Sequence, residues 1–135
     1  GGVLVINACS QDQINDAYWY YHLVPCARAA MAAGFAPLET IEALLTDVGL
    51  TPRGRFMPVD AICQGDAYFH SRGPLEKPWR DGDSFWARAD DGELAAALAK
   101  VRDMDAAGTL DAFVAEHDGP RRHLGQITFV AASLD

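Results

Sequence analysis

Hydrophobic and polar positions along this chain alternate between strand-like and helix-like patterns. After two glycines, residues 3–8 form an apolar run that is rich in β-branched side chains. Such a run is typical of a strand that is buried on both faces of a parallel sheet and has a neighbour on either side. Few later segments could supply these neighbours. Because the chain also lacks an initiating Met, we expect Gly1 to be a tag remnant or a position inside a longer protein.

A helix is expected directly after this first strand. Ser10 and Gln13 have the spacing of a capping box, in which each side chain bonds the backbone amide of the other residue. The helix that starts here should run to Pro25, which removes an amide donor and kinks or restarts it. The remainder is almost all alanine and methionine and should end at Gly34. With so few polar positions, this second part is expected to pack on several sides.

The next two segments read as a helix and a strand. Leucine, isoleucine and valine recur at helical spacing between Pro37, which suits a first turn, and Gly49, which closes the helix. Residues 51–54 then read as a turn, and residues 55–64 read as a second strand. Pro58 argues against a regular interior for this strand, because proline is confined to the edges and bulges of a sheet.

The remainder of the chain contains an aromatic loop, two helices and a last strand. Residues 65–88 have no regular period but are rich in aromatic residues, glycine and proline. Loops of this length often form lids or binding loops; alternatively, the rings only tack the loop to the core. Helices are predicted over 91–105 and from a cap at Thr109, and a strand over 126–132. The order β-α-α-β-loop-α-α-β predicts one α/β domain over the whole chain.

Composition and charge narrow the class of protein. The chain has 135 residues, half of them apolar and 22% charged, which is ordinary globular composition. Its net charge is −8 and no basic run is longer than Arg121-Arg122, so a nucleic-acid partner is not expected. No apolar stretch approaches the roughly 18 residues of a membrane span, so we expect a soluble protein without a membrane partner. Three widely separated cysteines read as free thiols in a reducing cytoplasm.

Four segments together carry a family resemblance. They are the opening Gly1-Gly2-Val3-Leu4-Val5-Ile6, the helix end Leu44-Leu45-Thr46-Asp47-Val48-Gly49-Leu50, the strand after it, and the closing Gly125-Gln126-Ile127-Thr128-Phe129-Val130-Ala131-Ala132. They resemble the C-terminal half of class I S-adenosylmethionine-dependent methyltransferases. Residues 86–117 also resemble the helical insertion that small-molecule members carry before their last strand.

The resemblance implies a fold and a division of the chain. The three strands would be the last three of a seven-stranded Rossmann-like sheet, with the final strand antiparallel and helices on the faces of the sheet. The aromatic loop 65–88 and the helical insertion 89–118 would form a cap. The first four strands of the family fold would then lie outside this chain.

The resemblance also implies S-adenosylmethionine as the methyl donor of the complete enzyme. In this family a glycine-rich loop after the first strand and an acidic residue after the second hold the cofactor. The twelve glycines here form neither G-x-G-x-G nor G-x-G-x-x-G. We therefore expect that this chain alone does not bind the cofactor and that a missing N-terminal half supplies the cofactor site.

Candidate substrate-binding residues follow the first strand. In the fold that the resemblance implies, the ligand crevice lies beyond the carboxyl ends of the parallel strands. Cys9, Ser10 and Gln11 come directly after the first strand and would face this crevice. The capping box already accounts for Ser10 without a substrate.

The run Tyr18-Trp19-Tyr20-Tyr21-His22 has the most unusual composition in the chain. Tyr18, Tyr21 and His22 are spaced i, i+3 and i+4, so one helical face would present two phenols and an imidazole. This spacing predicts an aromatic acceptor pocket in which His22 is a general base. The alternative is a packed amphipathic helix whose tyrosine hydroxyls reach water.

A second candidate set lies at the start of the aromatic loop. Asp66, Tyr68 and His70 alternate along the sequence and would share one face of an extended segment. His70 beside Asp66 would be an acid/base pair in the same crevice, with Tyr68 as a substrate contact. The alternative is that Asp66 only caps the turn after Gly65.

The other histidines and the cysteines do not predict a site. His117 and His123 lie beside Asp118, Arg121 and Arg122, and a solvated surface is expected there. No pair of histidines or cysteines has the spacing of about two to four residues that a zinc site uses. The sequence therefore predicts no metal centre.

Two functions remain open at the level of sequence. The resemblance implies a cytoplasmic methyltransferase that acts on a small, uncharged or cationic organic acceptor, with this chain supplying the acceptor side. Positioning the acceptor would account for most of the acceleration of such a transfer. The alternative is a noncatalytic, truncated or degenerate chain that acts as a binding or assembly module. It would pair its exposed strand edge with the missing half or with a second copy of itself.

Overall fold

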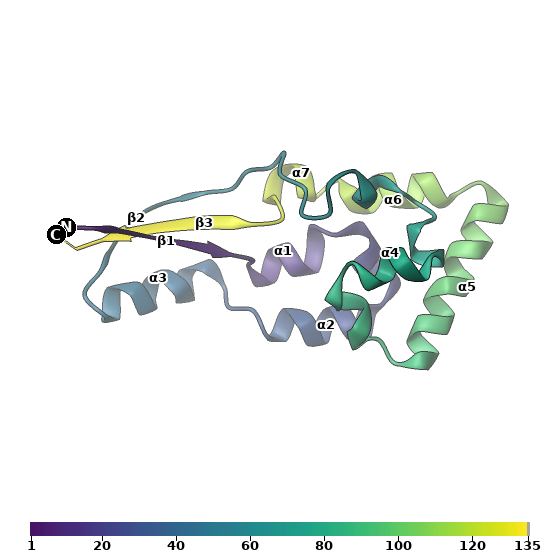
Figure 1. Ribbon diagram of the computed structural model, residues 1–135, viewed down its shortest axis with the longest axis horizontal. Helices are drawn as coiled ribbons and strands as arrows, with labels where there is room; N and C mark the ends of the chain where they lie inside the picture. Colours follow the sequence, from purple (N-terminus) through teal and green to yellow (C-terminus); the bar gives the residue numbers. More distant parts are fainter. Residues whose placement is uncertain (135) are drawn as a thin grey trace.

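The computed structural model describes residues 1–134 and places a small sheet at one end and most of the helices at the other (Figure 1). Both termini lie at the outer end of the sheet. Within residues 1–134, no helix has the length and apolar character that a membrane span needs. In chain order the elements, with short 3-10 helices labelled η, are β1 (Val3–Ala8), α1 (Gln11–Asp16), η1 (Trp19–Leu23), α2 (Pro25–Ala33), α3 (Leu38–Asp47), β2 (Thr51–Phe56), η2 (Gly65–Phe69), η3 (Gly73–Leu75), α4 (Lys77–Asp81), η4 (Ser84–Arg88), α5 (Asp91–Ala107), α6 (Leu110–Asp118), α7 (Arg121–Leu124) and β3 (Thr128–Ser133).

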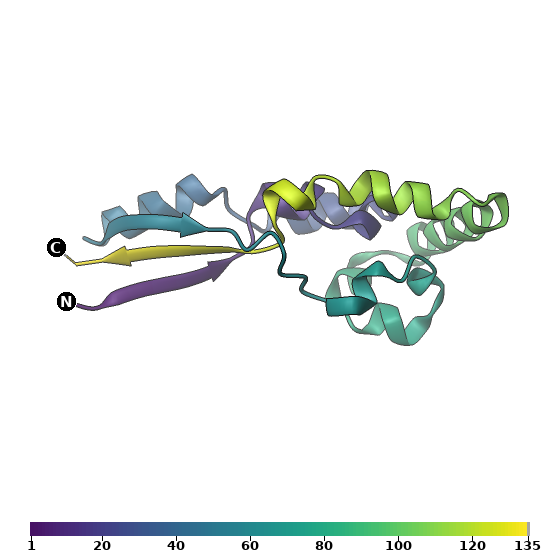
Figure 2. The same ribbon diagram turned by 90° about the horizontal axis from the view of Figure 1, so that it is seen from above.

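The sheet has three strands in the order β1-β3-β2, as Figure 2 shows. The last strand, β3, lies in the middle and runs antiparallel to both neighbours. Val5 of β1 lies opposite Ala131, and Phe56 of β2 lies opposite Phe129. The prediction of an α/β chain whose last strand is antiparallel is therefore confirmed.

One face of the sheet is covered by α3. Leu45 of this helix packs against Val130 and Ala132 of β3, and Ile6 of β1 joins the same cluster. Arg55 of β2 lies on the same face and forms salt bridges with two acidic residues of α3. The helix predicted from Pro37 to Gly49 is thus confirmed, and its apolar stripe is what covers the sheet.

The opposite face of the sheet is bare and apolar. Val3 is 69% exposed, Val5 is 56% exposed and Phe56 is 65% exposed. The Phe56 and Phe129 rings stack on this face, with centroids 6.5 Å apart. β1 pairs with β3 along one edge only, so the prediction that it is buried on both faces with two neighbours is wrong for residues 1–134.

The second strand begins earlier than predicted. The prediction placed a turn at 51–54 and the strand at 55–64, but β2 covers Thr51–Phe56 and the next eight residues are outside any strand. Pro52 is tolerated because β2 is an edge strand, and the pairing register shifts between Pro52 and Gly54. This shift is a β-bulge, and it contains the residues that the sequence indicated as a turn.

The helix predicted after β1 is broken into two parts. The capping box is confirmed, since Ser10 Oγ accepts from the Gln13 amide at 3.2 Å and Gln13 Oε1 accepts from the Ser10 amide at 2.9 Å. However, α1 ends at Asp16, and the chain passes through an extended Tyr18 into η1. Successive side chains of an α-helix point about 100° apart, so one helix cannot bury four consecutive rings against one core.

The helical region has an aromatic core. η1 contributes Trp19, Tyr20 and Tyr21, all buried, and the segment predicted as an irregular loop over 65–88 contributes Tyr68 and Phe85. That segment forms η2, η3, α4 and η4 rather than an open loop. The aromatic rings of this segment attach it to the core, which was the second of the two interpretations given for residues 65–88.

The remaining helices follow the sequence closely. α5 extends two residues beyond the predicted range of 91–105, and Gly108 ends it in the left-handed region at φ 71°. α6 begins after Thr109, as predicted. Before β3, Gly125 also has a positive φ, 63°, and the chain turns there, so β3 starts at Thr128 rather than at residue 126.

Candidate functional site

Two thiols and a phenol lie together beyond the carboxyl end of β1. The Cys9 thiol donates to the backbone carbonyl of Gln126 at 3.2 Å, and the Tyr18 hydroxyl lies 3.4 Å from the same oxygen. The Tyr18 hydroxyl is also 3.7 Å from Cys63 Sγ. We call Cys9, Tyr18 and Cys63 the thiol–phenol cluster. Burial raises the pKa of Cys9 to about 11, so this thiol is neutral at pH 7.

Gln126 holds this cluster in place. The side chain is fully buried; its Oε1 accepts from the Cys63 amide at 2.8 Å and its Nε2 donates to the Ala17 carbonyl at 3.2 Å. One residue therefore joins the end of β1, the turn between α1 and η1, and the segment that leaves β2. A buried amide with all these bonds made is rigid, because losing any one of them leaves a buried polar group unpaired.

Tyr18 and Tyr21 do pair as the i, i+3 spacing predicted. Their rings stack with centroids 4.4 Å apart, and Tyr21 also stacks on Phe85 at 3.6 Å. Burial raises the pKa of both phenols, followed by the charge of Asp83 for Tyr21 and by smaller contributions from the nearby thiols for both. Both hydroxyls therefore stay protonated near pH 7 and act as hydrogen-bond donors.

Asp83 is the charged group on which the tyrosines of η1 converge. Its Oδ2 accepts from the Tyr20 hydroxyl, from the Tyr21 hydroxyl at 3.5 Å and from Gln64 Nε2 at 3.3 Å. Its Oδ1 accepts from the Phe85 amide at 2.9 Å and so caps η4. This carboxylate thus connects η1, the segment after β2 and η4.

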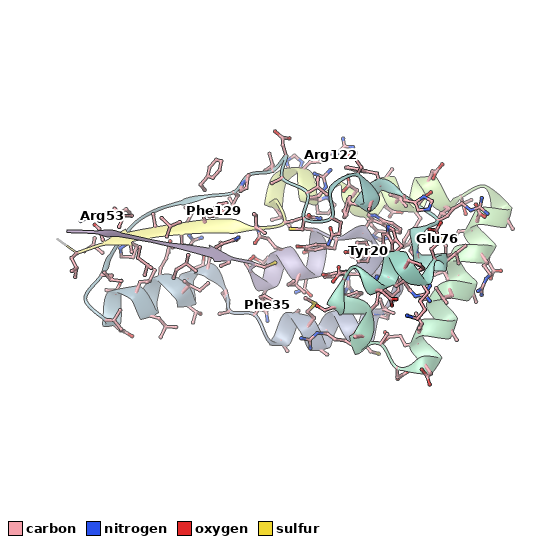
Figure 3. The ribbon with its side chains drawn as sticks, viewed as in Figure 1. Tyr20, Phe35, Arg53, Glu76, Arg122 and Phe129 are labelled. Carbon is pink, nitrogen blue, oxygen red and sulfur yellow. The ribbon has the colours of Figure 1, made fainter. Side chains whose placement is uncertain are left out.

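A cavity of about 410 Å³ opens beside these groups, which we call the aromatic cavity. Its volume lies in the range of small-molecule sites. Tyr20 lines this cavity and lies within the helical region, away from the sheet (Figure 3). The lining includes Tyr20, Cys63, Gln64, Trp79, Asp83 and Ser84. Cys63 belongs to both the cavity lining and the thiol–phenol cluster, so the cluster borders the cavity at this residue.

Ser10 and Gln11 do not join the thiol–phenol cluster. Ser10 is buried as the cap of α1, and Gln11 Nε2 donates to the Ala32 carbonyl at 3.1 Å. Both line a separate, smaller cavity of about 190 Å³ between α1 and α3. Of the three residues predicted to face the crevice, only Cys9 belongs to the thiol–phenol cluster, and none of the three lines the aromatic cavity.

His22 points away from Tyr18 and Tyr21. Its ring stacks on His117 with centroids 4.3 Å apart, and its Nδ1 lies 2.6 Å from Arg28 Nη1. Burial, followed by the charge of Arg28, lowers the pKa of His22 to about 4. The predicted common face is wrong because His22 lies in the 3-10 helix η1, where positions i and i+3 lie above one another but position i+4 is turned about 120° away.

Asp66, Tyr68 and His70 do not share a face either. They were predicted in an extended segment, but Asp66 and Tyr68 lie in η2, where alternation does not apply. Tyr68 points into the core and donates to Asp118 Oδ1 at 2.8 Å. His70 Nε2 lies 2.8 Å from Glu76 Oε1, so its carboxylate partner is Glu76 rather than Asp66.

The surface predicted around His117 contains a buried ion pair instead. Asp118 and Arg121 are both buried, with Arg121 Nε 2.6 Å from Asp118 Oδ1 and Nη2 2.9 Å from Oδ2. Burial disfavours the Asp118 carboxylate, but the bonds from Arg121 and Tyr68 outweigh it and lower the pKa of Asp118. This network supports α6 and α7 and does not reach the aromatic cavity.

The described residues do not fit S-adenosylmethionine. β1 passes to α1 through Cys9 and Ser10, without a glycine turn, and Ser10 is buried under its own cap. β2 leads into residues 57–64 rather than into the start of a helix. Within residues 1–134 there is thus no strand–glycine turn–helix unit of the kind that binds a nucleoside cofactor. The same residues contain no group of three or more His, Cys, Asp or Glu placed to hold a metal ion.

Sequence reasoning missed several residues that build the site, among them Gln64, Asp83 and Gln126. Asp83 had a local signal, since an Asp before Ser-Phe-Trp suits a helix cap. Gln126 is a polar residue at the start of an apolar run, and the pattern therefore assigned it as the first residue of a strand.

Comparisons of the chain with protein families, with curated proteins and with solved structures find no match.

Proposed function

We propose that this chain is the acceptor-side part of an S-adenosylmethionine-dependent methyltransferase that acts on a small organic molecule. The observation that carries this proposal is the aromatic cavity, whose lining residue Cys63 contacts Tyr18 in the thiol–phenol cluster that follows β1. In α/β sheets, ligands bind beyond the carboxyl ends of the strands. Aromatic walls and a few fixed polar groups are typical of sites for small organic ligands.

The unfinished sheet also supports the proposal. β1 is mostly apolar, yet Val3 and Val5 are largely exposed and one edge of the strand is unpaired by the described residues. Further strands added at this edge, with helices on the bare face, would cover both features. The antiparallel β3 agrees with the last strand of the family fold that the sequence resembles.

The cofactor would then come from outside these residues. When bound, S-adenosylmethionine supplies a methyl group on a sulfonium centre. The residues of this chain would bind and orient the acceptor, with Tyr20 and Trp79 beside its body and Gln64 and Asp83 beside its polar group. Such positioning can account for much of the acceleration, because it removes the entropy cost of bringing two reactants together.

Calorimetric titration with S-adenosylmethionine tests the division of the site. Residues 1–135 alone should bind no cofactor, whereas the protein encoded by the complete reading frame should bind one molecule and transfer a labelled methyl group to a small acceptor. Tight one-to-one binding by residues 1–135 would contradict the claim that the cofactor site lies elsewhere. A complete protein that binds no S-adenosylmethionine would overturn the methyltransferase proposal.

The bare sheet face favours a second candidate function, that of a noncatalytic binding or assembly module. The exposed Val3, Val5 and Phe56 form an apolar surface next to the unpaired edge of β1. Unpaired edges recruit further strands, here from a second copy of the chain. Light scattering distinguishes the two functions, since this candidate requires a dimer of the complete protein that does not bind S-adenosylmethionine.

A further inference from the structure

The polar side chains that line the aromatic cavity are acidic or uncharged. Asp83 contributes a carboxylate and Gln64 contributes a carbonyl oxygen, and both are hydrogen-bond acceptors. Cys63 and Ser84 add uncharged side chains. No lysine, arginine or histidine is among the described residues that line this cavity. The lining therefore suits a ligand that carries donors and positive charge, and it disfavours an anion.

The carbonyl oxygen of Gln64 is buried and has no hydrogen-bond partner among the described residues. The orientation of this side chain is fixed, because Gln64 Nε2 donates to Asp83 Oδ2 at 3.3 Å. Turning the amide over would bring its oxygen against the Asp83 carboxylate. A buried acceptor left without a donor is unusual in folded proteins. Gln64 Oε1 has almost no accessible surface in this structure, so a ligand donor reaches it only after a small movement of the Gln64 side chain, and the hydrogen bond gained favours that movement.

Two aromatic rings stand beside these acceptors. The rings of Tyr20 and Trp79 lie 5.1 Å apart and are inclined at 76° to each other. The Trp79 indole N–H is already used, since it donates to the Ala67 carbonyl at 2.8 Å. Gly73 packs closely under the indole, and a Cβ at that position would collide with it. The ring is therefore held in place, and what it can offer a ligand is its π face, which attracts cations.

We propose that the aromatic cavity binds a small organic amine in its protonated, cationic form. The ammonium group lies within the field of Asp83 and donates to Gln64 Oε1 once that side chain has moved toward it, and the hydrocarbon part packs against Trp79 and Tyr20. As a statement about the methyl acceptor, this inference rests on the proposed function: the ammonium group anchors the ligand, and because its nitrogen has no lone pair, the methyl group would go to another atom of the ligand. As a statement about binding, it depends only on the cavity. The net charge of −8 favours the approach of a cation from solution.

The test uses the protein encoded by the complete reading frame and three probes of one shape. Benzylammonium carries a positive charge, benzyl alcohol is neutral and benzoate is negative. Titration followed by tryptophan fluorescence and calorimetry should show one site for benzylammonium, about tenfold weaker binding of benzyl alcohol and no binding of benzoate. Equal affinity for benzylammonium and benzyl alcohol would overturn the proposal.

Variants locate the site. Asp83→Asn should weaken benzylammonium binding by about tenfold, because the charge is lost while the capping oxygen is kept. Asp81→Asn is the matched control: it removes the same charge two residues away, from an exposed side chain outside this lining, and should change affinity less than about twofold. An unchanged affinity in Asp83→Asn, or equal losses in the two variants, would contradict the assignment.

A second variant separates binding from folding. Because Asp83 also caps η4 and accepts from Tyr20, Asp83→Asn could act through stability, which circular dichroism and thermal unfolding would reveal. Gln64→Leu keeps the size of a half-buried side chain and removes the open acceptor, so it should weaken benzylammonium by about fivefold and leave benzyl alcohol unchanged. Equal weakening of both probes would contradict a donor bond to Gln64 Oε1.

The outcomes for the two proposals can be distinguished. Binding of benzylammonium that depends on Asp83 and Gln64, in a complete protein that transfers no methyl group, would keep this inference and overturn the proposed function. Methyl transfer to a neutral acceptor by a complete protein that binds no benzylammonium would keep the proposed function and overturn this inference.

Discussion

The Tyr68 hydroxyl donates a 2.8 Å hydrogen bond to Oδ1 of Asp118, a carboxylate fifty residues further along the chain. The same carboxylate is held by Arg121, whose Nη1 also donates to the Val59 carbonyl at 3.2 Å. This network ties η2 and the segment after β2 to α6 and α7. It explains why the aromatic segment over 65–88 is anchored rather than open.

Replacing Tyr68 and replacing Asp118 should lower the free energy of unfolding by different amounts. Tyr68→Phe leaves the Asp118–Arg121 pair intact and should cost about 1–2 kcal/mol of the free energy of unfolding. Asp118→Ala leaves Arg121 buried without its counter-charge and should cost about 3–5 kcal/mol. Urea denaturation measures both. Equal costs would show that Arg121 finds another partner when Asp118 is absent.

Stability should fall between neutral and mildly acidic pH because of His22. The pKa of His22 is lowered from 6.5 to about 4, chiefly by burial and then by Arg28. Between these values the unfolded chain binds a proton that the folded chain does not, so the free energy of unfolding decreases as pH falls through this window. Above about pH 7 the imidazole is neutral in both states and contributes no slope.

The variant His22→Gln isolates this contribution. Urea denaturation at pH 7.5 and at pH 5 should show a smaller loss of stability in the variant than in the unchanged chain. At pH 7.5 and pH 8.5 the difference in stability between the two proteins should be constant, which serves as an internal control. A variant with the same loss between pH 7.5 and pH 5 would assign the pH dependence to other groups.

The three cysteines should differ in reactivity. Burial raises the pKa of Cys9 to about 11, so very little thiolate is present at pH 8, whereas Cys26 and Cys63 are exposed. Alkylation with iodoacetamide at pH 8, followed by peptide mass spectrometry, should label Cys9 last. In urea all three should be labelled at similar rates. Early labelling of Cys9 in the folded protein would contradict its bond to the Gln126 carbonyl.

The bare sheet face gives a prediction that depends on the proposed function. Val5 is exposed in residues 1–135, so Val5→Lys should change the stability of that chain by less than about 0.5 kcal/mol. If further strands and helices cover β1 in the complete protein, the same change should cost about 2 kcal/mol or more there. Equal effects of Val5→Lys in the two proteins would mean that nothing covers this face. Leu45→Ala, on the face that α3 covers, should destabilise both.

The site could be predicted only where a contact is local. The stacking of Tyr18 and Tyr21 and the place of Cys9 beyond β1 followed from spacing and order. The roles of Gln64 and Asp83 did not, because they depend on how η1, η4 and the segment after β2 meet. Local reasoning also placed His70 beside Asp66, although its carboxylate partner is Glu76 on the far side of η3.

The sequence by itself determined the elements whose causes are local. The capping box of Ser10 and Gln13, the amphipathic α3 and the glycine that ends α5 were all predictable, because each depends on neighbouring residues or on helical spacing. The antiparallel last strand was expected only from the family resemblance. Tertiary structure alone decided where α1 breaks, which face of β1 is covered and which polar groups surround the cavity. Burial of the four consecutive rings of residues 18–21 outweighs the local helix propensity there. Contacts between residues that are tens of positions apart depend on how the elements pack, which no short sequence pattern encodes.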